Sequence, residues 1–193
     1  GKINGTVHTC IGQEFSALAF AGQISKDDAV FSNHRCHGHF LSYTKNYVGL
    51  ISELLGKETG VCGGVGSSQH LHQDNFYSNG IQGGIMPLAA GFALGFKIQN
   101  KKNIAICYIG DGTLGEGVVY ETFNIISKWK IPLLVVCENN GIAQSTLIDD
   151  ALSGSISKRA EAFDIKVFEG NTSNNIHLFE ESEKAINFVR ENS

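Results

Sequence analysis

Two kinds of apolar pattern divide the chain. Short apolar runs predict strands at 29–32, 103–110, 132–138 and 165–170, and the second and third of these are apolar throughout. Apolar residues at helical spacing, or rich in small side chains, predict helices over 11–24, 47–56, 85–99, 115–129, 155–163 and 176–192. Fully apolar strands that alternate with helices predict an α/β fold, with a parallel sheet covered by helices on both faces.

Residues 60–84 show neither pattern. This segment is rich in glycine, contains His70 and His72, and is too polar to be a buried strand. We therefore predict a long ordered loop, and loops of this length in compact domains are usually functional. Both histidines are open to two interpretations, a catalytic role or a purely structural bond to the backbone. No linker or repeat divides the chain, so residues 1–193 are predicted to form one domain.

Composition narrows the function classes. The 193 residues are 42% hydrophobic and 18% charged, with a net charge of -4 and no run of Lys or Arg, so neither nucleic acid nor a membrane is an expected partner. No apolar stretch reaches the roughly 20 residues that span a bilayer, and the first residues lack the layout of a signal peptide. The cysteines are odd in number and contain no CxxC pair, which favours reduced thiols and a cytoplasmic location: Cys10, Cys36, Cys62, Cys107 and Cys137. Cys107 and Cys137 are expected in the core.

The candidate chemistry lies after two predicted strands. Residues 110–115, GDGTLG, match the GxGxxG pattern of dinucleotide-binding proteins, with Glu138 as a candidate ribose-binding acid. However, Asp111 would stand where the pyrophosphate of a dinucleotide comes closest to the backbone, and the two anions would repel each other. A divalent cation between them removes this repulsion. Asp111, an amide oxygen of the Asn139–Asn140 pair and a diphosphate together suit magnesium, which prefers oxygen ligands. A mere tight turn is the alternative.

This arrangement, GDG followed after 26 residues by NN, resembles the thiamine diphosphate motif of transketolase-like enzymes. Five longer segments resemble, in order and spacing, the alpha subunit of the first component of 2-oxo acid dehydrogenases: VHTCIGQE (7–14), HRCHGH (34–39), GVCGGVGSSQHL (60–71), NGIQGGIMPLAAG (79–91) and WKIPLLVVCENNGIA (129–143). The resemblance implies a three-layer thiamine-diphosphate-binding fold and the oxidative decarboxylation of a small 2-oxo acid with acyl transfer.

The resemblance also implies site residues. Magnesium would be held by Asp111, Asn140 and the backbone carbonyl of Ile142. The diphosphate would be bound at Gly110, Gly112 and Thr113, at the start of a helix, and by Arg35. The remaining assignments are Gly80 and Gln82 for the aminopyrimidine ring, and His8 and His37 as candidate catalytic residues, with His8 near the substrate.

The sequence departs from the family at several points. His34 stands where the family usually has Tyr, and the family's N-terminal helix and C-terminal segment with a further active-site histidine are absent. The glutamate that activates the cofactor belongs to the beta subunit in this family, so the expected partner is a beta-type subunit in a heterotetramer, or another copy of the chain. Alternatives are a transketolase-type subunit, a non-catalytic binding module, and a zinc site in residues 34–39.

Overall fold

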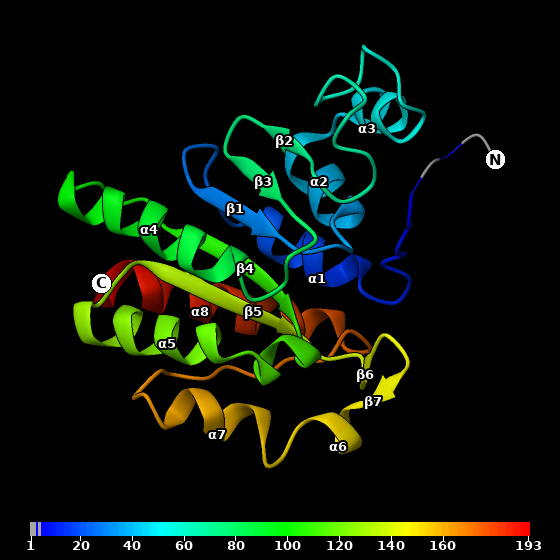
Figure 1. Cartoon of the computed structure of the whole chain (residues 1–193). Helices are drawn as coiled ribbons and strands as arrows, with labels where there is room; N and C mark the ends of the chain where they lie inside the picture. Colours follow the sequence, from blue (N-terminus) through cyan, green and yellow to red (C-terminus); the bar gives the residue numbers. More distant parts are fainter. Residues whose placement is uncertain (1–2, 4) are drawn as a thin grey trace.

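The computed structural model describes residue 3 and residues 5–193, and its centre is a five-stranded sheet (Figure 1). The strand order is β2-β3-β1-β4-β5, and all neighbours are parallel except β2 and β3. This confirms the predicted α/β class. The strands are β1 (Ala29–Ser32), β2 (His72–Gln73), β3 (Phe76–Ser78), β4 (Ala105–Gly110) and β5 (Leu133–Glu138).

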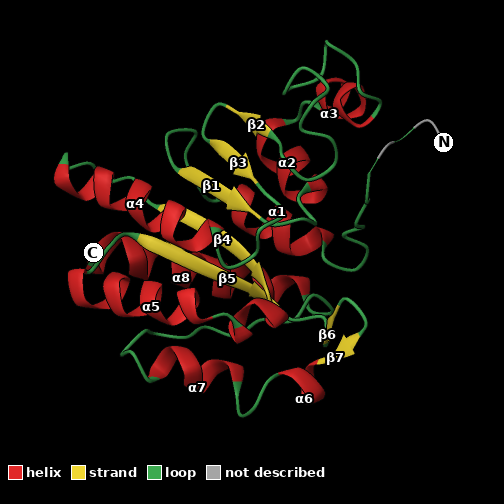
Figure 2. Cartoon of the chain, in the orientation of Figure 1, coloured by secondary structure: helices red, strands yellow, loops and turns green. Residues whose placement is uncertain are grey.

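Helices cover both faces of the sheet (Figure 2). Helices α4 and α5 lie on one face, and α1 and α8 lie on the other. A short 3₁₀ turn, η1 (Asp111–Gly115), follows β4, and a two-stranded ribbon, β6 (Ile142–Ala143) with β7 (Thr146–Leu147), follows β5. The helices are α1 (Glu14–Ala21), α2 (His37–Thr44), α3 (Tyr47–Leu54), α4 (Ile85–Ile98), α5 (Gly117–Trp129), α6 (Ile148–Ala151), α7 (Ile156–Glu161) and α8 (Asn175–Asn192).

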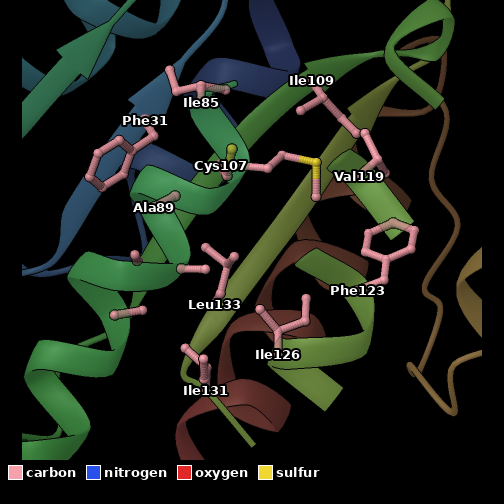
Figure 3. Packing of buried hydrophobic residues seen from close by; sticks show 14 of the residues in the cluster. Phe31, Ile85, Ala89, Cys107, Ile109, Val119, Phe123, Ile126, Ile131 and Leu133 are labelled. Atoms are coloured by element: carbon pink, nitrogen blue, oxygen red, sulfur yellow. The ribbon is translucent and has the colours of Figure 1, made fainter. Parts of the chain in front are cut away.

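Strand β4 is apolar throughout because each of its faces meets a different core. Cys107 and Ile109 point into the core formed with α4 and α5, which Figure 3 shows. Ile106 and Tyr108 point to the opposite side, into the core formed with α1, α2 and α8. Successive strand residues alternate between faces, so a strand with two buried faces carries no polar positions. Cys107 is fully buried and Cys137 packs partly buried against the same core, as expected.

The predicted elements differ from the structure in several places. The helix expected at 11–24 spans only α1, because Gly12 has a φ of +85° and the Glu14 carboxylate accepts the Gly12 N–H at the helix start. The helix expected from residue 115 begins as η1, and α5 starts at Gly117. The loop expected over 60–84 contains β2 and β3, so that prediction was wrong for residues 72–78.

The strand predicted at 165–170 does not form. Ile165 packs against the core around α4 and α5, and Phe168 contacts Phe188 of α8 with ring centroids 5.8 Å apart. These half-buried side chains therefore pack against the core without a strand partner for their backbone. All five cysteines are free, and every helix in the described residues is too short or too polar to cross a bilayer.

Candidate functional site

The two sequence motifs meet at the carboxyl ends of β4 and β5. The strands are in register, and Gly110 is opposite Glu138. Asp111 is 2% exposed; its Oδ1 accepts the Gly112 N–H at 3.0 Å and its Oδ2 accepts the Gly141 N–H at 3.0 Å. The second of these bonds fixes the loop after β5 to the residue after β4. The neighbourhood of the GDG and NN motifs that the sequence predicts is therefore present in the structure.

The oxygen atoms of this loop suit a hard cation. The Asn140 side chain is exposed, and its Oδ1 accepts the Ile142 N–H at 3.1 Å. A carboxylate or amide oxygen has two lone-pair directions, so one hydrogen bond leaves each of these atoms able to accept a further ligand. Carboxylate and amide oxygens are ligands that magnesium prefers. The donor set at Asp111 and Asn140 thus fits magnesium with a diphosphate.

Gly112 lies against the ribbon that follows the Asn pair. A Cβ built at Gly112 would stand 2.5 Å from the Ala143 Cβ, closer than real Cβ atoms approach. We expect Gly112→Ala to lower the free energy of unfolding by about 1–3 kcal/mol, because the backbone of β6 or η1 must move. Gly115→Ala is the control, since a Cβ there meets nothing within 4 Å. Urea unfolding measures both, and equal stability of the two variants would contradict the prediction.

A second group of site residues comes from the N-terminal half. The rings of His8 and His34 are in edge contact, with centroids 4.4 Å apart, and Arg35 Nη1 donates to the Thr9 carbonyl at 2.5 Å. Within the described residues, His34 Nδ1 and Gln82 Oε1 are buried without a hydrogen-bond partner. Burial, followed by the charge of Arg35, lowers the pKa of His8; burial and then His8 itself lower the pKa of His34. Both imidazoles are therefore kept from protonation at neutral pH.

An open cavity of about 1630 Å³ is lined by Arg35, Glu138 and Asn140, among other residues. One predicted diphosphate residue and one predicted magnesium residue therefore face the same cavity, whereas Asp111 does not line it. Glu138 Oε2 is buried without a hydrogen-bond partner in the described part of the chain. Buried polar atoms without partners are unusual in a folded protein, and this one lies at the wall of the cavity.

Other predicted residues have local partners. His37 Nε2 lies 2.9 Å from the Ser68 carbonyl, and His72 Nδ1 lies 3.1 Å from the Phe76 carbonyl. Gly80 lies against the side chain of Gln69, which leaves no room for a Cβ. Thr113 is buried within η1.

Residues 34–39, the segment of the zinc alternative, are not extended, because the chain turns and enters α2 at His37. His37 and His39 contact different neighbours, Ser68 and Glu138. The described residues hold no cluster of three or more His, Cys, Asp or Glu side chains suited to a metal ion.

Comparison with known proteins identifies the family. The family model described as "Dehydrogenase E1 component" matches residues 1–193. The chain belongs to the dehydrogenase E1 component family. It is 33% identical, over 98% of its length, to the alpha subunit of acetoin:2,6-dichlorophenolindophenol oxidoreductase from Bacillus subtilis. It is also 33% identical, over 100% of its length, to the pyruvate dehydrogenase E1 component subunit alpha from Rickettsia bellii.

These relatives are longer than this chain, which spans 58% of the B. subtilis subunit and 60% of the R. bellii subunit. A solved structure from Mycobacterium smegmatis, described as that of a thiamin diphosphate-dependent enzyme, superposes with a TM-score of 0.62 at 18% identity. The superposition covers 91% of this chain and 29% of the other. At this identity the match shows the shared fold, which agrees with the predicted E1 fold.

Several residues near the candidate site of this E1 chain were not identified from the sequence. His39 is buried and contacts both Ser32 and Glu138. Glu116 Oε1 accepts the Gly83 N–H at 3.0 Å, which connects the turn after Asp111 to the loop that carries Gln82. Glu116 has one local signal, an acid inside the glycine-rich stretch 112–117, whereas His39 has none.

Glu138 also differs from its sequence-based interpretation. It was a candidate ribose-binding acid, yet its Oε1 faces His39 at 3.2 Å, and its side chain is 5% exposed. Burial by itself raises the pKa of Glu138, but the nearby His39, Ser16 and Asn33 outweigh it and lower the pKa. The carboxyl is therefore an anion at neutral pH, held inside the E1 domain.

Proposed function

We propose that this chain binds thiamine diphosphate and Mg²⁺, and contributes the diphosphate half of an active site that acts on a small 2-oxo acid. The observation that carries the proposal is the buried Asp111 carboxylate, which is hydrogen-bonded to Gly141 beside the Asn139–Asn140 pair. Membership in the E1 family supports the proposed reaction class, oxidative decarboxylation with acyl transfer.

The chain's own residues bind and orient the cofactor. Asp111, the Asn140 amide and the Ile142 carbonyl would hold Mg²⁺. The Arg35 guanidinium would donate charge-assisted hydrogen bonds to the diphosphate, and N–H groups of residues 110–113 would donate to it as well. Gly80 and Gln82 would contact the aminopyrimidine ring. When bound, thiamine diphosphate supplies the carbanion chemistry, and the protein supplies position and electrostatics.

His8 is the proposed substrate-facing histidine. Its lowered pKa keeps the imidazole neutral at neutral pH, so it can donate one N–H to the carboxylate of a 2-oxo acid without carrying a charge of its own. His37 is the second candidate, although its Nε2 already contacts the Ser68 carbonyl.

The proposed partner is a beta-type subunit, in a heterotetramer, or a second copy of the chain. The names of the two relatives, each an alpha subunit, support this proposal. Helix α4 supports it too, because Leu88, Phe92 and Ile98 are exposed apolar residues. The cytoplasmic location remains a prediction.

Calorimetric titration of thiamine diphosphate, with and without Mg²⁺, tests the proposal. We expect Mg²⁺-dependent binding to the wild type and none to Asp111→Ala, because the substitution removes the only charged metal ligand proposed here. Asp149→Ala, at an exposed acid, is the matched control and should bind like the wild type.

The titration is run on the chain alone and on the chain co-expressed with a beta-type subunit, with NAD as a parallel ligand. Binding of NAD in place of thiamine diphosphate would overturn the charge argument at residues 110–115. Absence of Mg²⁺-dependent binding in both preparations would contradict the proposed function.

A further inference from the structure

His39 connects the two halves of the candidate site. It lies in the first turn of α2, is 2% exposed, and comes four residues after Arg35 in the same segment. Its ring contacts the last residue of β1 on one side and the last residue of β5 on the other. These strands lie on either side of β4, which leads into Asp111.

The two ring nitrogens have separate partners. His39 Nδ1 lies 2.8 Å from Ser32 Oγ, and Nε2 lies 3.2 Å from Glu138 Oε1. Nε2 is thus paired with the Glu138 carboxyl group, and Nδ1 is left to bond with the Ser32 hydroxyl. The imidazole therefore bridges two strand ends, that of β1 through Nδ1 and that of β5 through Nε2.

The ring is also fixed by stacking. His39 stacks on Tyr108 of β4, with ring centroids 3.8 Å apart and an interplanar angle of 25°. The Tyr108 hydroxyl in turn lies 2.9 Å from the Tyr43 hydroxyl. His39 thus contacts β1, β4 and β5, and these three contacts together orient its ring.

The hydrogen bond between His39 and Ser32 joins the two ends of the segment 32–39, which contains Arg35. Ser32 and His39 are its two ends, and the Arg35 N–H is held inside it by Asn33 Oδ1 at 2.8 Å. Glu138 immediately precedes Asn139 and Asn140. One side chain therefore sets the position of the segment with the diphosphate-binding arginine relative to the loop with the magnesium ligands.

We propose that His39 is a positioning residue, which holds the Arg35 segment and the Asn139–Asn140 loop at the separation that a magnesium diphosphate requires. This inference rests on the proposed function of the same site. His39 itself touches neither group of ligands, and it acts through Ser32 and Glu138.

Two variants separate the hydrogen bonds of His39 from its bulk. His39→Phe keeps an aromatic ring on Tyr108 and removes both hydrogen bonds, whereas His39→Gln retains an amide that can donate to Glu138. Tyr43→Phe is the matched control. It removes the hydrogen bond to Tyr108 from the same buried stack but touches neither Ser32 nor Glu138.

Amide hydrogen exchange of residues 139–142, measured without cofactor, is the first readout. We expect His39→Phe to raise exchange there about tenfold or more, since one hydrogen bond to a charged group is worth about 1.5–3 kcal/mol. We expect a smaller increase for His39→Gln and none for Tyr43→Phe. Mg²⁺-dependent thiamine diphosphate affinity is the second readout, with an expected loss of about tenfold in His39→Phe only.

Thermal unfolding of each variant completes the experiment. Unchanged exchange in His39→Phe would overturn the inference, and so would equal increases in His39→Phe and Tyr43→Phe, because the effect would then be general loosening of the core. If the wild type fails to bind the cofactor, the proposed function fails, while the exchange measurement still decides the role of His39.

Discussion

Replacing Glu53 by Gln is expected to lower the free energy of unfolding by about 3 kcal/mol or more. The Glu53 side chain is buried, and its carboxylate accepts four backbone N–H groups of the glycine-rich segment: Gly66 at 2.7 Å and Ser67 at 3.1 Å on Oε1, and Cys62 at 2.8 Å and Gly64 at 2.9 Å on Oε2. A glutamine offers one oxygen, and its NH₂ group would face two of these donors. Each buried polar group left unpaired costs about 1–3 kcal/mol.

Urea unfolding measures this loss, and limited proteolysis within residues 60–71 shows where the structure loosens. Glu58→Gln is the control, since Glu58 is an exposed acid near the same segment. A loss of stability no larger in Glu53→Gln than in Glu58→Gln would refute the assigned role.

The pH dependence of stability provides an independent check on Glu53. Burial raises its pKa, but the hydrogen bonds from Gly64, Cys62, Gly66 and Ser67 outweigh burial, and the pKa lies below its ordinary value of 4.5. The folded state therefore binds this proton less readily than the unfolded state. The contribution of Glu53 is complete above pH 4.5 and is lost as the pH falls through the lower folded pKa. Glu53→Gln should lack this part of the acid transition.

Asp28→Asn is expected to destabilise the chain by about 3 kcal/mol, because it breaks an ion pair whose acidic partner is buried. The Arg190 guanidinium at the end of α8 donates to both oxygens of Asp28, at 3.2 Å on Oδ1 and more closely on Oδ2. The Ile104 N–H and the Ser25 N–H bond the same carboxylate at 2.9 and 2.8 Å. This carboxylate therefore fixes α8 to the starts of β1 and β4.

Thermal and urea unfolding of Asp28→Asn, with the exposed neighbour Asp27→Asn as control, measure the effect. Burial raises the pKa of Asp28, while Arg190, Ile104 and Ser25 lower it further than burial raises it. Its contribution is thus present above pH 3.8 and disappears at lower pH. Comparable stability of the two variants would show that α8 is held by its apolar face alone.

The apolar pattern of the sequence was sufficient to predict the strands whose two faces are both covered by helices. Residues 105–110 and 133–138 contain almost no polar side chain, and only a covered parallel strand accounts for such a run at that length. The proximity of Asp111 and Asn140 followed from the same reasoning, because parallel strands bring their carboxyl ends to one edge. Chain order alone does not state which strands are neighbours.

Residues 165–170 show why the same reasoning fails elsewhere. An apolar pattern indicates that side chains pack against a core, whereas a strand also needs a neighbouring strand for its backbone hydrogen bonds. Phe168 is half-buried and its ring contacts Phe188 of α8, so apolar contact is obtained without strand pairing. Residues 72–78 are the opposite case: β3 pairs with β1, and the polar strand β2 pairs with β3 at the sheet edge, although the segment lacks an apolar pattern.

Glu53 and His39 could not be assigned from the sequence, because their partners are fixed by tertiary structure. Glu53 bonds N–H groups 9–14 residues away, and His39 bonds Glu138 across 99 residues. A lone acid in the apolar segment 47–56, followed by a glycine-rich run whose backbone N–H groups need acceptors, is a usable signal in retrospect. No comparable local signal marks His39.

The strand order has a consequence for the folding of the chain. Strand β1 pairs with β4, and the whole of residues 33–104 lies between them in the sequence. Closing so long a loop costs conformational entropy, and this cost comes before the contacts between β1 and β4 stabilise the chain. Contacts of large sequence separation therefore slow folding. Arg35 lies inside this loop and Asp111 directly follows β4, so the candidate site is complete only once β1 and β4 have paired. During synthesis, the ligand site therefore cannot form before residues 105–111 have emerged.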